Sequence, residues 1–267
     1  MHSSEPQAIH TSEGDITQRR FGGLERLYGI RGARRIRGSH VVVVGIGGVG
    51  SWAAEALARS GVGRITLIDM DHVAESNINR QIHATTSTIG QAKVLAMRDR
   101  IALINPSCEV RCIDDFVEVE NWPGLLGKEG VDAVIDACDQ VKAKVAMAAW
   151  ALRGRHLFIS VGAAGGKRHA HRVDIDDLSQ TTHDPLLAQL RYRLRKQHGA
   201  AKDGKKIGVA CVYSKEAVAA PDASCAVSGD GTLNCHGYGS VVAVTATFGQ
   251  CAVGWVLDKI SAVSSKA

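Results

Sequence analysis

Short runs of β-branched and apolar residues alternate with longer alanine-rich or amphipathic stretches along residues 41–161. The short runs are typical of strands buried on both faces of a parallel sheet, and they occupy residues 41–44, 65–68, 109–113, 133–135 and 157–161. The longer stretches predict helices at residues 51–60, 91–104 and 142–152. Because strands that alternate with helices build parallel sheets, the sequence predicts a Rossmann-like α/β fold, a mostly parallel sheet with helices on both faces.

A glycine-rich loop follows the first predicted strand and leads directly into the first predicted helix. Gly45, Gly47, Gly48 and Gly50 form its pattern. Such glycines let the backbone approach a phosphate closely, and the helix N-terminus adds N–H donors and a favourable dipole. Asp69 ends the next predicted strand, where a carboxylate accepts hydrogen bonds from ribose hydroxyls. This context predicts an adenine-nucleotide site, for which a dehydrogenase is the ordinary interpretation.

Polar and charged residues after the second predicted strand favour a triphosphate instead. Asp71 completes a D-x-D pattern with Asp69, and Asn77, Arg80 and Lys93 follow along the chain. Guanidinium and ammonium groups stabilise the charge that develops on a phosphoryl group during transfer. These residues argue against hydride chemistry. For the glycine loop itself, the alternative to a nucleotide site is a turn that only permits close packing of the helix on the strand.

A second acidic pair, Asp136 and Asp139, closes the predicted strand at 133–135. Ligands of parallel sheets bind at the carboxyl ends of the strands, and carboxylates there can hold Mg²⁺. A helix cap is the alternative role for a single aspartate at this place. In combination with Asp69 and Arg80, Asp136 is predicted to hold Mg²⁺ or nucleotide.

These motifs together resemble those of the ubiquitin-activating-enzyme-like (HesA/MoeB/ThiF) adenylating superfamily. The shared motifs are GIGGVG at 45–50, D-x-D at 69–71, SNINRQ at 76–81, Lys93 and D-x-x-D at 136–139. Further stretches are similar to the branch that dehydrates N6-threonylcarbamoyladenosine in tRNA to its cyclic form, and they lie at 20–23, 26–29, 47–58, 79–84 and 245–249. The resemblance implies the adenylating fold, ATP and Mg²⁺ as ligands, and adenylation of a carboxylate followed by cyclisation.

The resemblance also implies roles for individual residues. Nucleotide contacts are implied for Gly45, Gly47, Gly48, Gly50, Asp69, Asp71, Asn77, Arg80, Lys93 and Asp136. Catalytic roles are implied for Arg20, Arg80, Lys93, Asp136 and Cys235, with Asp136 as the metal ligand. Arg20 resembles an arginine that relatives insert into a neighbouring subunit's ATP site, which implies a homodimer. For Cys235, capture of the acyl group and a buried turn residue both remain open.

The second half of the chain is basic and looser in pattern. We expect a disordered tail at 1–18, an ATP-binding adenylation domain at 19–165 and a basic substrate-binding and dimerisation extension of the same domain at 166–267. Residues 151–267 hold 15 Lys and Arg against 9 Asp and Glu, which is compatible with a nucleic-acid partner and equally with a solvated basic face; the resemblance implies that the partner is tRNA. Candidate tRNA contacts are Lys167, Arg168, Arg172, Arg191, Arg193, Arg195 and Lys196, with a solvated helix face as the alternative.

The cysteines and the longest apolar stretch bear on where the protein works. The seven cysteines follow no secretory signal and contain no C-x-x-C pair, which predicts reduced thiols, a cytoplasmic location and no structural zinc. Residues 240–257 carry no charge; a buried or subunit-interface helix is favoured there over a membrane span. Cys211 is predicted to be a core residue, and His83 a solvent-facing loop residue rather than a ligand contact.

Three other functions stay in view beside the tRNA-modifying enzyme. An enzyme that activates a sulfur-carrier protein would share the ATP site, but the missing C-x-x-C pairs disfavour it. A nucleotide sensor without catalysis is disfavoured by the presence of Arg80, Lys93 and Asp136 together, and a dehydrogenase is more distant still. A monovalent cation (Na⁺ or K⁺) and a cysteine desulfurase or sulfur-acceptor system are further expectations from the family.

Overall fold

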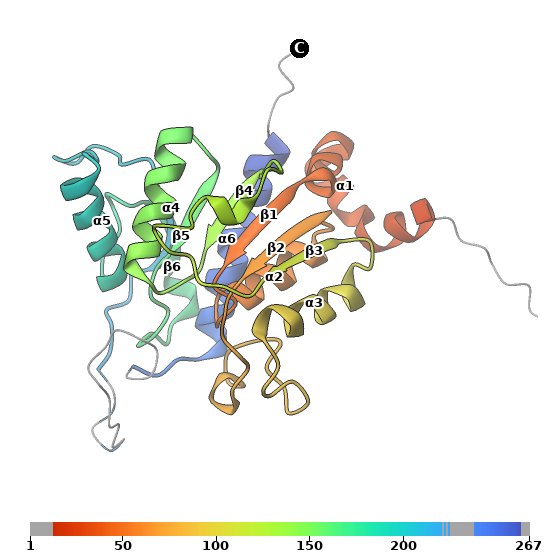
Figure 1. Ribbon diagram of the computed structural model, residues 1–267, viewed down its shortest axis with the longest axis horizontal. Helices are drawn as coiled ribbons and strands as arrows, with labels where there is room; N and C mark the ends of the chain where they lie inside the picture. The colour runs from red at the N-terminus through yellow and green to blue at the C-terminus, as the bar shows by residue number, and fades with distance from the viewer. Residues whose placement is uncertain (1–12, 221, 223, 225–237, 263–267) are drawn as a thin grey trace, which may run out of the picture.

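A seven-stranded sheet lies at the centre of the computed structural model, which describes residues 13–220, 222, 224 and 238–262 (Figure 1). The strand order is β3-β2-β1-β4-β5-β7-β6, and every neighbouring pair is parallel except β6 with β7. The strands are β1 His40–Val44, β2 Arg64–Ile68, β3 Glu109–Ile113, β4 Ala133–Asp136, β5 Phe158–Val161, β6 Val173–Asp177 and β7 Ala210–Ser214. The predicted Rossmann-like α/β class is confirmed.

Helices cover both faces of this sheet. They are α1 Glu13–Gly38, α2 Gly50–Arg59, α3 Lys93–Ile104, α4 Val141–Gly154, α5 Pro185–Gln197 and α6 Val242–Ala262. Successive side chains of a strand point to opposite faces, so Val41 and Val43 pack with residues of α2, α3 and α6, whereas Val42 and Val44 pack with α4 and α5. Figure 1 shows α4 and α5 on the side of the sheet opposite to α6. Two apolar layers therefore enclose the central strands.

The boundaries of the predicted elements agree closely with the structure, and the ends of the chain differ most. The five predicted strands and three predicted helices are all present, each within two residues at either end. Helix α1 begins at Glu13, inside the range 1–18 that was expected to be a disordered tail, and it kinks at Gly29, where φ is 71°. Residues 1–12 lie outside the described residues. A short 3-10 turn at Glu75–Asn77, η1, precedes Arg80.

The second half of the chain continues the same sheet. Strand β7 pairs with β5, and β6 forms the edge of the sheet beside β7. Helix α6 then packs on α2 and α1, and its buried residues include Val244, Phe248 and Val256. The uncharged stretch at 240–257 therefore contains a buried helix, as the sequence predicted. Within the described residues, no helix is both long and apolar enough to cross a bilayer.

The order of connections places a binding edge between β1 and β4. The chain moves from β1 outward through β2 and β3, and then returns to the other side of β1 as β4. Ligands of such sheets bind outside the carboxyl ends of the strands at this reversal. The glycine loop follows β1 and the Asp136–Asp139 turn follows β4, so the fold brings two of the predicted motifs to this edge.

Candidate functional site

The backbone of the glycine loop is closely packed at Gly45 and Gly50 and accessible at Gly47. Gly45 has φ of 83° and donates its N–H to the Ile68 carbonyl at 2.8 Å. A Cβ on Gly50 would lie 1.8 Å from the Gly45 carbonyl oxygen, so any side chain there would break the loop. By contrast, a Cβ on Gly47 would have no atom of the described residues within 4 Å. Gly47 is therefore the point where a ligand can approach the backbone.

Asp69 fixes the loop through its carboxylate. Its Oδ2 accepts the Ile46 N–H at 2.6 Å and its Oδ1 accepts the Asp71 N–H at 2.8 Å. Burial raises the pKa of Asp69, and the charge of Lys93 together with the two backbone donors offsets part of that rise. The side chain therefore joins the end of β2 to the glycine loop, at the place where the sequence predicted a ribose contact.

Lys93 and Asp71 form an ion pair at the same edge. The Lys93 ammonium donates to Asp71 Oδ2 at 2.6 Å, and the Lys93 side chain is only 8 % exposed against 55 % for Asp71. The backbone joins the same two residues, since the Lys93 N–H donates to the Asp71 carbonyl. The ammonium is therefore held in place by a partner that solvent can reach, and a phosphate could compete for it.

Arg80 lies directly beside the glycine loop. A Cβ on Gly48 would lie 3.3 Å from Arg80 Cγ, and the guanidinium donates to the Ser76 carbonyl at 2.6 Å and to Asn79 Oδ1 at 3.1 Å. Asn77 instead uses its Oδ1 to accept the Ala74 N–H, which closes the turn before Arg80. The structure thus brings Arg80 to the loop as predicted, while the oxygen of Asn77 shapes the turn.

Asp136 is buried and fully engaged. It is 0 % exposed, and its Oδ2 accepts the Lys144 ammonium at 3.0 Å and the Ser160 hydroxyl at 2.7 Å. Its Oδ1 accepts the Cys138 N–H at 3.3 Å. Burial alone would lower the pKa of Lys144, but the neighbouring Asp136 carboxylate outweighs it and raises that pKa. This arrangement disagrees with the predicted role of Asp136 as a Mg²⁺ ligand, because both its oxygens serve internal partners away from solvent.

The turn after β4 carries an exposed carboxylate beside the loop. A Cβ on Gly45 would lie 2.8 Å from the Cys138 backbone nitrogen, so the turn touches the glycine loop. Asp139, the next residue, is exposed. Burial, with the nearby Asp136 carboxylate, raises the pKa of the Cys138 thiol well above its ordinary value. Of the two aspartates in the D-x-x-D motif, Asp139 is the one that a metal or phosphate could reach.

His83 is buried, which corrects the prediction of a solvent-facing loop histidine. The residue is 2 % exposed, and neither ring nitrogen has a hydrogen-bond partner among the described residues. Burial, with smaller contributions from the positive charges of Lys93 and Arg100, lowers the pKa of His83 to about 4. The ring is therefore neutral at physiological pH and belongs to the protein interior, three residues after Arg80.

Three of the seven predicted tRNA contacts make hydrogen bonds within the fold. Lys167 is 2 % exposed and donates to the carbonyls of His183 and Glu216. Arg191 donates to the Leu178 and Thr181 carbonyls and to the Thr181 hydroxyl, and Arg195 donates to the Ala201 carbonyl. Arg168, Arg172 and Lys196 are exposed and Arg193 is half-buried. The prediction was wrong for Lys167, because its ammonium has no access to an RNA phosphate.

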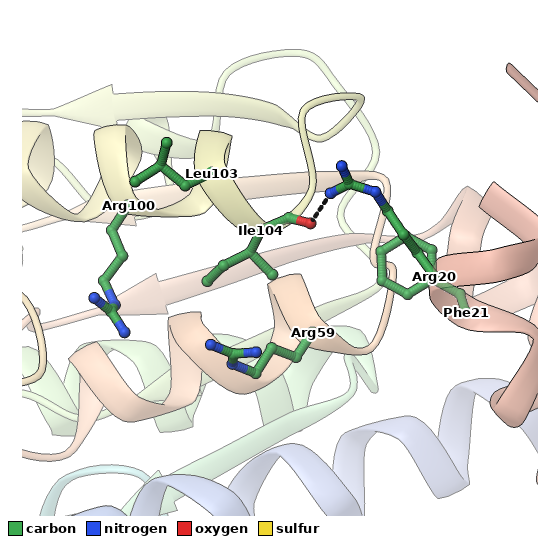
Figure 2. Close-up of a pocket in the computed structure, with 6 residues that line it drawn as sticks. All are labelled: Arg20, Phe21, Arg59, Arg100, Leu103 and Ile104. Atoms are coloured by element: carbon green, nitrogen blue, oxygen red, sulfur yellow. Dashed lines mark hydrogen bonds between the residues drawn. The ribbon is translucent and has the colours of Figure 1, made fainter. Parts of the chain in front are cut away.

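Arg20 lies at the far end of α3 from the glycine loop. Its guanidinium donates to the Ile104 carbonyl at 2.6 Å, in a surface pocket of about 480 Å³ that Arg59 and Arg100 also line (Figure 2). Buried Glu55 accepts hydrogen bonds from Arg59 and Arg100. Within one chain Arg20 is therefore not part of the loop site, and its insertion into a neighbouring subunit stays a prediction.

The thiols and possible metal ligands complete the site. Cys211 is fully buried, as predicted, and burial raises the pKa of its thiol well above the ordinary value. Cys235 lies outside the described residues. The five described cysteines are free thiols, and no group of three or more His, Cys, Asp or Glu side chains in the described ranges could enclose a metal ion.

Sequence reasoning missed two interior partners of the site. Lys144 and Ser160 hold Asp136 from α4 and β5, and neither belongs to a motif. The signal for Lys144 was its position in an alanine-rich helix, on the same face as Val141 and Ala148. A charged residue on such a face needs a buried counter-charge.

Comparison with known proteins extends these observations over the whole chain. A family model described as the ThiF family matches residues 21–266. A curated protein of Haemophilus influenzae, tRNA threonylcarbamoyladenosine dehydratase, is 45 % identical over 248 residues, which cover 92 % of this chain and 95 % of that protein. Crystal structures of the E. coli tRNA N6-threonylcarbamoyladenosine dehydratase with ATP and with AMP each give a TM-score of 0.83, at 43 % and 44 % identity, and cover 94 % and 95 % of this chain and 97 % of each structure's chain.

Proposed function

The chain belongs to the ThiF family, and we propose that it catalyses the ATP-dependent dehydration of N6-threonylcarbamoyladenosine in tRNA to the cyclic form. One observation carries the proposal: the glycine loop, Asp69, the Arg80 turn and Lys93 converge on one sheet edge. They do so in a chain that matches named dehydratases over more than nine-tenths of its length, one of them crystallised with ATP and with AMP.

The first chemical step activates a carboxylate. A carboxylate is a poor electrophile because its leaving group would be oxide. Attack of one carboxylate oxygen on the α-phosphorus of ATP forms an acyl-adenylate, and the bond to pyrophosphate breaks. Backbone N–H groups of the glycine loop lie where a phosphate can approach at Gly47, and Arg80 and Lys93 supply positive charge beside it. Preorganised donors of this kind stabilise the charge that develops during phosphoryl and nucleotidyl transfer.

The second step needs no protein nucleophile. The urea group of the same substrate attacks the activated acyl carbon, the ring closes, AMP leaves with the former carboxylate oxygen, and the urea releases a proton. The net change is loss of one water driven by cleavage of ATP to AMP and pyrophosphate. Holding two reacting groups in one molecule lowers a barrier by roughly 7–11 kcal/mol. The protein's main contribution at this step is to position the substrate and exclude water.

Mg²⁺ fits this site through Asp139 rather than Asp136. Mg²⁺ in nucleotide sites is held by one or two carboxylates together with the substrate phosphates, so no dedicated cage is required. Asp139 is exposed on the turn that touches the glycine loop, while both oxygens of Asp136 are engaged internally. When bound, Mg²⁺ would neutralise phosphate charge. Asp136 is then a positioning residue, which with Lys144 fixes the turn that presents Asp139.

The proposal includes the partners that this reaction needs. The RNA would reach the site from the carboxyl edge of the sheet, and Arg168, Arg172, Arg193 and Lys196 are candidates for its phosphates. A homodimer in which Arg20 reaches the neighbouring nucleotide site, a monovalent cation, a sulfur-transfer partner and a cytoplasmic location stay predictions. So does acyl capture by Cys235.

Analysis of tRNA nucleosides by mass spectrometry tests the function. After incubation of the enzyme with ATP and tRNA that carries threonylcarbamoyladenosine, we expect that nucleoside to lose the mass of one water molecule, with one AMP and one pyrophosphate formed per product. The matched control is Arg80→Ala, which we expect to fold normally and to release no pyrophosphate. Consumption of ATP without any change in the tRNA nucleosides would contradict the proposal and favour another carboxylate as the substrate.

A further inference from the structure

Trp52 connects the two elements that surround the nucleotide edge. It lies in the first turn of α2, immediately after the glycine loop, and its indole Nε1–H donates to the Arg80 carbonyl at 2.9 Å. Its side chain is half-buried. An indole has one donor and no acceptor, so this bond uses the whole polar capacity of Trp52. This hydrogen bond therefore ties the backbone at Arg80 to the helix that follows the glycine loop.

Helix α6 also contacts the Arg80 carbonyl. The hydroxyl of Thr245, which is 3 % exposed, lies 3.4 Å from the Arg80 carbonyl and 3.3 Å from the Val242 carbonyl of its own helix. A Cβ on Gly48 would lie 3.3 Å from Thr245 Cγ2, and one on Gly249 would lie 2.6 Å from the Val49 carbonyl oxygen. The first turns of α6 thus pack closely against the glycine loop.

Asn79 joins the guanidinium of Arg80 to the approach of α6. Its Nδ2 donates to the Ser240 carbonyl at 3.0 Å, and its Oδ1 accepts from Arg80 Nη1 at 3.1 Å. The backbone of Arg80 is held by Trp52 and Thr245, whereas its side chain donates, among the residues that the structure describes, to exposed acceptors. To meet a phosphate, the guanidinium needs to exchange those acceptors while its backbone stays in place.

We propose that Trp52 is a positioning residue for ATP, which acts by fixing the backbone of Arg80 between the glycine loop and α6. The inference rests on the proposed function only in taking ATP as the ligand. A group that is already in position loses less conformational freedom when it binds. The indole therefore strengthens ATP binding without touching the nucleotide.

A double-mutant cycle on ATP affinity tests this role. Trp52→Phe keeps an aromatic ring and removes the N–H donor. The free energy of one such hydrogen bond sets the upper limit of the positioning effect, so we expect the dissociation constant for ATP to rise by up to about tenfold. Arg80→Ala should weaken ATP binding further. In the Arg80→Ala background, Trp52→Phe should have no additional effect, because the indole acts through the guanidinium. The affinities are measured by calorimetry on the full chain, without tRNA.

Matched controls separate positioning from folding. Trp255→Phe makes the same change at a tryptophan of α6 that lies ten residues, or about 15 Å, along the helix from Thr245. We expect this variant to bind ATP with wild-type affinity. If Trp52→Phe does not fold, Thr245→Val is the test variant and Thr245→Ser is its control. Thr245→Val should weaken ATP binding about twofold, and Thr245→Ser should leave it unchanged.

The outcomes distinguish failure of the role of Trp52 from failure of the proposed function. Equal ATP affinity in the wild type and Trp52→Phe overturns the inference, and so does an equal loss in both Arg80 backgrounds. A wild-type chain that binds no ATP overturns the proposed function itself, together with the inference.

Discussion

Removal of the Lys144 ammonium should destabilise the protein strongly. Lys144 and Asp136 are both 0 % exposed, and the ammonium also donates to the Val161 carbonyl at 2.7 Å. In Lys144→Met the Asp136 carboxylate stays buried without its counter-charge. Breaking a buried pair in this way costs about 3–5 kcal/mol. For a domain with roughly 5–15 kcal/mol of total stability, this is a large share, and it corresponds to a fall in melting temperature on the order of 10 °C.

A second substitution tests whether the cost has this electrostatic origin. In Lys144→Met with Asp136→Asn, no charge is left in the interior, so we expect the double variant to be more stable than Lys144→Met alone. Urea unfolding at pH 7 measures both free energies. A double variant that is less stable than the single one would refute the reasoning, since the two residues would then contribute independently.

Four further outcomes follow from the same geometry. Because burial lowers the pKa of His83 to about 4 while the unfolded chain titrates near 6.5, stability should fall as pH drops from 6.5 toward 4, by about 3 kcal/mol from this group; the pH slope of urea unfolding should be shallower in His83→Gln, and an unchanged slope counts against it. Gly47→Ala should keep the melting temperature and lose ATP binding, whereas Gly50→Ala should lose both, as thermal scans with and without ATP would reveal. Asp139→Asn should raise the Mg²⁺ concentration needed for half-maximal pyrophosphate release severalfold with little change in melting temperature; an unchanged Mg²⁺ requirement would remove Asp139 from the site. The affinity for tRNA should fall linearly with salt on logarithmic axes, and an affinity independent of salt would argue against phosphate contacts.

The central strands could be predicted from the sequence, whereas the edge strand β6 and the start of α1 could not. Residues 41–44 are four consecutive valines, and such a run has few alternatives to a strand buried on both faces. Strand β6, Val173–Asp177, alternates apolar and acidic residues at the edge of the sheet, and its half-exposed positions give a weaker signal. The first turns of α1 were assigned to a disordered tail because the start of the chain shows no sustained apolar pattern.

The candidate site divides along the same line. The glycine loop, Asp69 and Arg80 could be brought together on paper, because each follows a strand whose carboxyl end reaches one edge. The burial of Asp136 could not, because it depends on Lys144 and Ser160, whose side chains come from other elements. Nor could the burial of His83, which no motif indicates. Sequence spacing shows which residues share an edge; it does not show which of them turn inward.

This distinction between inward and outward charges also describes how the site could work. Asp136 is held by buried Lys144, and exchange of that partner would expose a bare charge to the interior. Lys93 and Arg80 are held instead by the half-exposed Asp71 carboxylate and by acceptors on an exposed turn. A phosphate can replace these outer partners, because Asp71 and the acceptors of the turn stay solvated when they are released. The inner pair then keeps the turn at 136–139 rigid while the outer groups change partners, so rigidity and exchange belong to different residues of one sheet edge.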